Sequence, residues 1–389
     1  MSVTAAEGFV AAGVACGIKA SGDPDLSLVA TDDGQPGTAA AVFTSNLATA
    51  APVIVSRRHL AGSGGRVSAV VLNSGNANAA TGAEGVGHAE RMCHLVAAGL
   101  ECATENVVVC STGLIGIPLP VDVIALGIPR LLSARATGPE AGESAARAIM
   151  TTDTQRKQTV QRAGPITVGG MAKGAAMLAP NMATMLAVLT TDAALSPAEL
   201  QVHLAAAVRD SFNALSVDGC TSTNDTVLLI ASGRAGPPEP GSFARALSDA
   251  CADLAGQMAG DAEGATKVVT VRVVGATDDA QAGVAARKVA ESQLVKCSFY
   301  GEDPYWGRVV SELGSAGVAF DPDRVTISYG GIAVARNGVA ADHDAGAVKA
   351  HMAARQVELV ADLHLGPGAA VILTNDLTHA YIDENMRTS

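Results

Sequence analysis

A threonine beside a small residue is the side chain in this sequence whose setting most suggests chemistry. Thr184 follows Ala183 in KGAAMLAPNMATMLAVLTTDA (residues 173–193), a largely small or apolar segment broken at Pro180-Asn181. A threonine hydroxyl is a weak nucleophile at neutral pH and needs a neighbouring base. Cutting the chain before Thr184 would supply one, because a new α-amine has a reference pKa of about 7.7–8.0. Without further context, an ordinary threonine at a strand start is the commoner interpretation.

Signatures of other nucleophiles and of cofactors are absent from the sequence. It contains no GxxxxGK[ST] phosphate loop, no HExxH zinc pair and no GxSxG nucleophile elbow. The histidines occur singly, and His88 and His94 are too far apart on their predicted helix to be good metal ligands. We therefore expect neither a metal ion nor a bound cofactor.

Hydrophobic periodicity predicts the elements that must position this threonine. Apolar runs bounded by turn residues predict strands at 38–44, 51–56, 66–75, 106–110 and 267–275. Spacing of three and four residues predicts helices at 82–100, 120–136, 142–150, 196–212, 242–258 and 278–292. Residues 324–336 and 357–376 are predicted hairpins that turn at glycines. The fold class is α/β to α+β, with layered mixed sheets flanked by helices.

Composition excludes several classes of partner. The chain has 389 residues and a formal net charge of −12, without a Lys/Arg run, which argues against nucleic acid. Its start lacks the features of a signal peptide, and no apolar run is long enough to span a bilayer. The seven cysteines are scattered without CxxC spacing, which predicts reduced thiols. We expect a cytoplasmic protein with no nucleic-acid or membrane partner.

Sequence blocks along nearly the whole chain point to one family. They are GVACGIKASGDPDLSLV, VVLNSGNANAATG, CSTGLIG, AIMTTD, GGMAKGAAMLAPNMATMLAVLTTDA, STNDTVLL, DAEGATK, DPYWGR and HAYIDEN. In this order they resemble the ornithine acetyltransferase family, the arginine-biosynthesis glutamate N-acetyltransferases that cut themselves at an Ala-Thr bond. Two of these blocks depart from the family pattern. Ala175 and Ala176 stand where a glycine is common, and Tyr305 stands where an asparagine is usual.

The resemblance implies roles for the residues that match family positions. Thr184 matches the nucleophile, Ala183 the residue before the cleaved bond, and Thr112 with Gly113 the oxyanion-hole pair. The positions matching substrate-binding residues are Thr151, Lys173, Thr184, Glu263, Asn385 and Ser389. Glu263 would pair with an ammonium group and Lys173 with an α-carboxylate. Use of the last two positions requires an ordered C-terminus.

Each of these residues also has an ordinary structural interpretation. The STG sequence around Thr112 and Gly113 is typical of a simple turn. Lys173 is equally typical of a solvated loop charge, and Asn385 of a frayed chain end. These interpretations stay open at the level of sequence.

The same resemblance implies a domain organisation and a reaction. Residues 1–183 would form an α chain and 184–389 a β chain, with 184–275 completing an αββα main domain of N-terminal-nucleophile type and 276–389 forming a smaller α+β domain. An acetyl group would pass from N2-acetyl-L-ornithine to L-glutamate through an acetyl-Thr184 ester. Paired chains would give an α2β2 heterotetramer. Whether acetyl-CoA is also a donor stays open.

Two other functional classes remain as alternatives. A threonine-nucleophile amidohydrolase or aminopeptidase of related architecture would pass the acyl group to water. A binding or structural protein would do no chemistry and would keep an intact chain.

Overall fold

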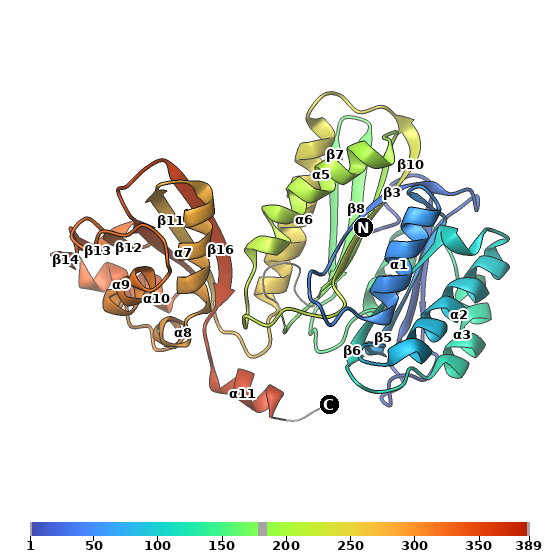
Figure 1. Cartoon of the computed structure of the whole chain (residues 1–389), viewed down its shortest axis with the longest axis horizontal. Coiled ribbons are helices and arrows are strands. Elements are labelled where there is room, and N and C mark those ends of the chain that lie inside the picture. The colour runs from blue at the N-terminus through green and yellow to red at the C-terminus, as the bar shows by residue number, and fades with distance from the viewer. Residues whose placement is uncertain (1, 178–184, 387–389) are drawn as a thin grey trace. The chain divides into compact units, whose positions relative to one another are not determined.

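The computed structural model describes residues 2–177 and 185–386, which form two compact units. Unit 1 comprises residues 2–177, 185–213 and 220–258, and unit 2 comprises residues 214–219 and 259–386. Figure 1 shows the chain and labels those helices and strands for which there is room. Within the described residues, none of the helices has the length and apolar character needed to cross a membrane.

Unit 1 contains two mixed sheets. Their strand orders are β1-β2-β5-β6 and β4-β3-β10-β9-β8-β7, with β5/β6 and β9/β10 parallel and the other neighbours antiparallel. The strands are β1 (Phe9–Val14), β2 (Leu26–Thr31), β3 (Gly37–Phe43), β4 (Arg66–Val67), β5 (Ala69–Asn76), β6 (Val107–Leu114), β7 (Lys157–Ala163), β8 (Ile166–Lys173), β9 (Leu186–Ala193) and β10 (Thr226–Gly236). The predicted core strand after Thr184 is therefore β9.

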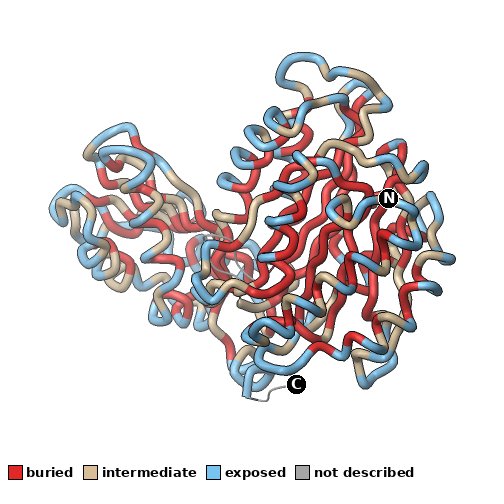
Figure 2. Tube along the Cα trace, turned by 45° about the vertical axis from the view of Figure 1, so that its right-hand side comes forward, coloured by how far each residue is buried: buried red, intermediate tan, exposed pale blue. Residues whose placement is uncertain are grey.

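The two sheets of unit 1 pack face to face. Leu72 of β5 shares a buried cluster with Val188 of β9 and Leu228 of β10, whereas Val71 belongs to a different cluster. Because side chains alternate across a strand, one face of β5 meets the second sheet and its other face meets helices. Figure 2 shows that the strands are buried along most of their length.

Helices cover the outer faces of these sheets. α2 (Gly82–Leu100) and α3 (Val121–Ser133) pack on the first sheet, where Met92 and Ile124 join the cluster around Leu28. α5 (Pro197–Arg209) packs on β3, and α6 (Ser242–Gly260) lies against β7. The remaining helical segments are α1 (Ala51–Gly62), α4 (Pro139–Ala148), η1 (Thr104–Asn106) and η2 (Phe212–Ala214). This helix–sheet–sheet–helix layering confirms the predicted class of mixed sheets flanked by helices.

The prediction of a strand at residues 51–56 is wrong, because this segment begins helix α1. Pro52 occupies the first turn of that helix, a position that proline favours. The helix covers the backbone edge of β6, the last strand of its sheet. Ser56 Oγ donates to Val109 O at 2.6 Å and accepts from Val109 N at 2.9 Å. A short apolar run cannot by itself distinguish a strand from such a helix.

Unit 2 is an α+β unit with one mixed sheet of order β14-β13-β12-β15-β11-β16. Its strands are β11 (Val268–Ala276), β12 (Thr326–Tyr329), β13 (Ile332–Arg336), β14 (Val339–Ala340), β15 (Gln356–Asp362) and β16 (Gly368–Asn375). Its helices are α7 (Asp279–Glu291), α8 (Gln293–Tyr300), α9 (Trp306–Gly314), α10 (Ala345–Ala353) and α11 (His379–Asn385). The unit begins before the expected boundary at residue 276, because β11 pairs with β15 and β16 of the same sheet.

One of the two predicted hairpins in unit 2 is wrong. β12 and β13 pair as predicted across Gly330-Gly331. β15 and β16 do not pair, because β11 lies between them, parallel to β15 and antiparallel to β16. The turn at Gly366 and Gly368 therefore connects β15 to β16 across the intervening strand β11. Pairing with a strand that lies far earlier in the chain leaves no local sequence signal.

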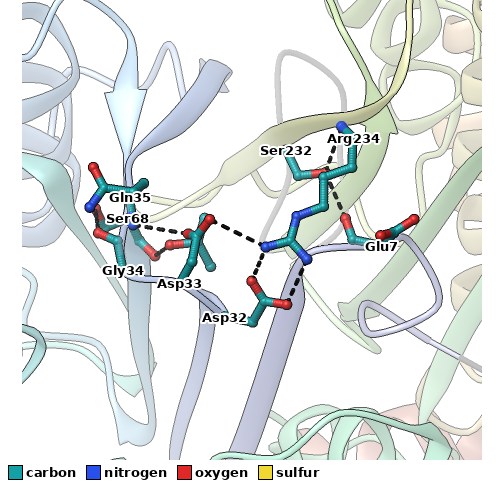
Figure 3. Close-up of polar contacts among 9 residues, drawn as sticks. Glu7, Asp32, Asp33, Gly34, Gln35, Ser68, Ser232 and Arg234 are labelled. Carbon is teal, nitrogen blue, oxygen red and sulfur yellow. Dashed lines mark hydrogen bonds and ion pairs between the residues drawn. The ribbon is translucent and has the colours of Figure 1, made fainter.

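An ion pair links the two sheets of unit 1 near the surface. The guanidinium of Arg234 on β10 contacts both carboxylate oxygens of Asp32, which follows β2, and lies 3.3 Å from Asp33 Oδ2 (Figure 3). The Arg234 and Asp32 side chains are 32% and 27% exposed, so water screens the attraction. Ion pairs of this kind contribute about 0–1 kcal/mol.

We predict that core packing stabilises unit 1 far more than this ion pair does. Leu28→Ala should lower the free energy of unfolding by about 2–5 kcal/mol, because it empties fully buried space. Asp32→Asn, in the loop that follows the same strand, should change it by about 0–1 kcal/mol. Denaturant unfolding followed by circular dichroism measures both changes. A larger loss for Asp32→Asn would contradict the prediction.

Candidate active site

Two sequence-predicted residues from different sheets meet inside unit 1. Lys173 ends β8 and Thr112 lies near the end of β6, and both are almost fully buried, at 3% and 2% exposure. Lys173 Nζ donates a hydrogen bond to Thr112 Oγ1 at 3.2 Å. Because the hydroxyl oxygen accepts from the lysine, its own proton is available to donate elsewhere. Such a hydroxyl is suited to stabilising a developing negative charge.

Gly113, on β6, has a backbone conformation that only glycine adopts readily. Its φ is 132°, and a Cβ there would lie 2.3 Å from the carbonyl carbon of Gly75. Gly75, the neighbour on β5, also has a positive φ of 96°, and the register of the two strands shifts at this point. The close approach therefore requires glycine at position 113.

A buried carboxylate connects Lys173 to Thr151. Asp153 Oδ1 accepts from Gly174 N at 2.7 Å and from Lys157 Nζ at 2.6 Å, and its Oδ2 accepts from Thr151 N at 3.0 Å. Burial alone would raise the pKa of Asp153, but the charges of Lys173 and Lys157 lower it to about 2. The ionised carboxylate thus anchors the backbone beside both predicted substrate-binding residues.

A cavity of about 340 Å³ opens beside Thr151. Lys19 and Asp153 help to line it, and Lys19 Nζ donates to Pro24 O at 2.9 Å and to Met150 O at 2.8 Å. Its volume falls within the range typical of small-molecule sites. Thr151 therefore borders space that an amino-acid substrate can occupy.

A second buried carboxyl lies at the start of β9. Asp225 Oδ1 accepts from Met185 N at 2.8 Å, and Met185 is the first described residue after the predicted cleavage point. The neighbouring Asn224 bridges the two sheets, because its Nδ2 donates to Ala77 O at 2.6 Å and to Ser111 O at 2.9 Å. The start of β10 therefore fixes both the start of β9 and the strand that carries Thr112.

Two predicted substrate-binding residues meet in unit 2. Asn385, at the end of α11, donates from Nδ2 to Glu263 Oε2 at 2.8 Å. The start of α11 is held nearby, because Thr378 Oγ1 donates to Gly264 O at 2.7 Å. Glu263 is 9% exposed and can accept a further cationic donor.

The structure therefore groups the described candidates into two sets. Thr112, Gly113, Thr151 and Lys173 belong to unit 1, and Glu263 and Asn385 belong to unit 2. Ala183, Thr184 and Ser389 lie outside the described residues. Among the residues that are described, no group of three or more histidine, cysteine, aspartate or glutamate side chains is arranged to hold a metal ion.

Sequence reasoning missed the two buried acids that organise the set in unit 1. Asp153 ends the block AIMTTD, and Asp225 lies in STNDTVLL directly before an apolar strand. For Asp225, the available signal was an acid placed immediately before the buried first half of β10. Its meaning depends on partners such as Gly174 for Asp153 and Met185 for Asp225, which only the fold brings together.

We predict that Gly113→Ala destabilises unit 1 more than the matched change Gly116→Ala. Both glycines have a positive φ, for which an alanine costs about 1–3 kcal/mol. Nothing lies within 4 Å of a Cβ at Gly116, whereas one at Gly113 would overlap the backbone of Gly75. Thermal unfolding of the two variants measures their stabilities. Equal losses of stability would contradict the expected clash with the backbone of Gly75.

We predict that Asp153 stabilises the fold at neutral pH and loses this effect in acid. Its folded pKa of about 2 lies below the unfolded value of about 3.9, so its contribution is complete above pH 4 and disappears as pH falls toward 2. Asp153→Ala should lower the unfolding free energy at pH 7 by about 3–5 kcal/mol, because the buried Lys157 loses the carboxylate that neutralises its charge. Urea unfolding at pH 7 and across pH 4 to 2 measures both effects.

A double variant serves as the control for this pair. Asp153→Ala combined with Lys157→Met removes both charges and should recover part of the loss. No recovery would mean that Asp153 stabilises the fold chiefly through the backbone amides of Thr151 and Gly174.

Comparison with known proteins identifies the family. The model of the ArgJ family matches residues 10–388. The arginine biosynthesis bifunctional protein ArgJ of Mycobacterium leprae (strain TN) is 48% identical, covering 98% of this chain and 94% of that protein. The protein of the same name from Thermobifida fusca (strain YX) is 46% identical and covers 99% of each chain.

A solved structure is also similar in sequence. It is ornithine acetyltransferase from Mycobacterium tuberculosis complexed with ornithine, with 46% identity, a TM-score of 0.44, and coverage of 46% of this chain and 94% of that chain. The family match and the full-length relatives confirm the resemblance found in the sequence. This chain belongs to the ArgJ family, whose members include bifunctional proteins of arginine biosynthesis.

Proposed function

We propose that this protein is a self-cleaving ornithine acetyltransferase that moves an acetyl group from N2-acetyl-L-ornithine to L-glutamate. The observation that carries the proposal is the buried contact of Lys173 Nζ with Thr112 Oγ1 beside Gly113. This contact lies at the end of β8, and the register pairs Lys173 with Leu186, two residues after Thr184. Family membership supplies the second line of support.

Self-cleavage is the first proposed reaction. The Thr184 hydroxyl oxygen attacks the Ala183 carbonyl carbon, so that the Oγ–C bond forms, the C–N bond breaks and the hydroxyl proton passes to the released nitrogen. Water then hydrolyses the ester, which gives a carboxylate at Ala183 and restores the Thr184 hydroxyl. The products are the α chain 1–183 and the β chain 184–389. The new α-amine is the base that later activates the hydroxyl.

Acetyl transfer then follows in two halves. Thr184 Oγ attacks the acetyl carbonyl of acetylornithine, its proton passes through the α-amine to the leaving nitrogen, and ornithine departs. The α-amine of glutamate attacks the acetyl-Thr184 ester, and the hydroxyl is restored. Thr112 Oγ1 and Gly113 N would hold the oxyanion in each half, and one such donor is typically worth about 2.7–4 kcal/mol. A covalent intermediate predicts ping-pong kinetics.

The charges of the candidate residues suit amino-acid substrates. Glu263, with Asn385 on one of its oxygens, can accept the side-chain ammonium of ornithine. Lys173 supplies a buried cation for an α-carboxylate, and Thr151 borders the adjacent cavity. Ser389 completes the proposed set. Glutamate and ornithine share the α-amino-acid group, so Lys173 can receive the α-carboxylate of each in turn.

Further properties follow from the family. We propose that the α and β chains stay associated and pair as an α2β2 heterotetramer in the cytoplasm. The curated relatives are named bifunctional, and acetyl-CoA is the proposed second acetyl donor. No metal or cofactor takes part in the proposed steps.

Thr184→Ala should abolish both self-cleavage and acetyl transfer, because it removes the attacking oxygen. A denaturing gel of the wild-type chain should show two fragments that begin at residues 1 and 184, whereas the variant should show one band. Purified wild-type protein should form acetylglutamate from acetylornithine and glutamate. A cleaved or active Thr184→Ala variant would refute the assignment of Thr184 as the nucleophile.

The same assay separates the alternative classes. Release of acetate that does not respond to glutamate would identify a hydrolase instead. A wild-type chain that stays intact and inactive would indicate a binding or structural protein instead. Replacing acetylornithine by acetyl-CoA tests for the second donor, and acetylglutamate should form again.

A further inference from the structure

Glutamate and ornithine differ at the ends of their side chains, and the proposed substrate contacts serve only one of these ends. Lys173 is the proposed partner of the α-carboxylate that both amino acids carry, and Glu263 that of the side-chain ammonium of ornithine. Glutamate carries a second carboxylate, at its γ position. Recognition of that group requires a further cation beside the candidate site.

Lys19 is a half-buried cation in the loop between β1 and β2. The loop is held by Asp25, whose carboxylate accepts from the backbone amides of residues 16–19. Lys19 Nζ donates to Met150 O at 2.8 Å and to Pro24 O at 2.9 Å. Because an ammonium group has three donors, these two bonds within the described part of the chain leave one for a ligand.

Contacts connect Lys19 to both parts of the candidate site in unit 1. A Cβ at Gly75 would lie 3.2 Å from Lys19 Cγ, so the stem of the lysine covers this glycine. Gly75 is also the residue whose backbone closely approaches Gly113. The ammonium end of Lys19 holds the carbonyl of Met150, directly before Thr151. Lys19 and Thr151 line the same cavity of about 340 Å³.

The charges around this cavity favour an anionic ligand. Its charged lining residues are Lys19, Asp23, Arg147, Asp153 and Arg156. The cations outnumber the acids here, although the chain as a whole has a formal net charge of −12. Asp153 is moreover paired with Lys157, with 2.6 Å between Oδ1 and Nζ. The cavity therefore attracts an anion more than a cation.

Lys19 is better placed than the two arginines to bind such an anion. The side chains of Arg147 and Arg156 are 58% and 44% exposed, and both lie within 4.0 Å of Glu143 Oε1. Burial lowers the pKa of Lys19 below its ordinary value, and the charge of Asp25 offsets this only in part. A half-buried ammonium group gains more from an anionic ligand than an exposed guanidinium does, because water screens it less.

We propose that Lys19 binds the γ-carboxylate of glutamate and thereby selects the acetyl acceptor. Lys173 pairs with the α-carboxylate, so each negative charge of a dicarboxylic amino acid has its own lysine. The two ammonium groups lie close enough to act on each other electrostatically, which suits a short molecule that carries both carboxylates. This inference rests on the proposed function, in which glutamate is the acceptor. Ornithine has a cationic side chain and gains nothing from Lys19.

Acceptor specificity tests this contact. Glutamine has the shape of glutamate but a neutral amide at the γ position, so the ratio of the two kcat/KM values measures recognition of the γ charge. Lys19→Met keeps an apolar stem over Gly75 and removes the ammonium group. It should lower kcat/KM for glutamate about 10- to 100-fold, the loss expected for a hydrogen bond between charged groups. The value for glutamine should stay near that of the wild type.

Exchange of labelled ornithine into acetylornithine is the internal control. It uses the same acetyl intermediate but an acceptor without a γ-carboxylate, so its rate in Lys19→Met should stay near that of the wild type. This exchange also shows that the variant is folded and forms the intermediate. Lys19→Arg keeps the positive charge and should recover most of the preference for glutamate. If Lys19→Met does not fold, Lys19→Gln provides the same test.

Arg156→Gln is the matched control for a general effect of charge. It removes one positive charge from the exposed rim of the same cavity. Because water screens that charge, kcat/KM for glutamate should fall by less than about fivefold. Equal losses in Arg156→Gln and Lys19→Met would indicate general electrostatic attraction instead of a contact with Lys19.

Four other results would overturn the inference. One is a wild type that acetylates glutamine as readily as glutamate. Another is a ratio of glutamate to glutamine that does not change in Lys19→Met. A third is an equal loss of ornithine exchange, which would make Lys19 only a structural support. The fourth is a higher KM for the acetyl donor alone. A wild-type protein that forms no acetylglutamate would instead refute the proposed function, so the two failures are distinguishable.

Discussion

Burying a lysine at the junction of two packed sheets is the constraint on which the candidate site depends. Lys173 reaches Thr112 from the opposite sheet, and both side chains are almost fully buried. A buried charge needs a nearby opposite charge, and Asp153 provides it while also anchoring the backbone beside Thr151 and Lys173. The electrostatic requirement of one side chain therefore fixes the placement of several others.

The β10 strand connects this charge network to the predicted nucleophile. Asn224 ties the start of β10 to the strand that carries Thr112, and Asp225 ties it to Met185. Hydrogen bonds to backbone atoms hold strand ends more rigidly than contacts between flexible side chains do, because fewer rotatable bonds are involved. Such rigidity is what acyl transfer at a fixed carbonyl position requires.

Local sequence predicted the elements whose signals are local. The capping box at Ser196 and Glu199 marks the start of α5, and the long amphipathic pattern over 82–100 coincides with α2. Predictions that depended on distant partners were wrong. The run at 51–56, predicted as a strand, forms a helix that covers the edge of β6. The strands β15 and β16, predicted to pair as a hairpin, are separated by β11. Hydrophobic periodicity indicates which face of a segment is buried, but not which distant residues pack against that face.

The sequence by itself determined the family and the class of layered α/β fold, because ordered blocks and periodicity are properties of the chain. It also marked Thr112, Gly113 and Lys173 as candidates. Only the tertiary structure decided that Lys173 is a buried partner of Thr112 and that Asp153 and Asp225 support the site. The physical reason is that burial and charge pairing depend on residues far apart in the chain, which meet only when the sheets pack.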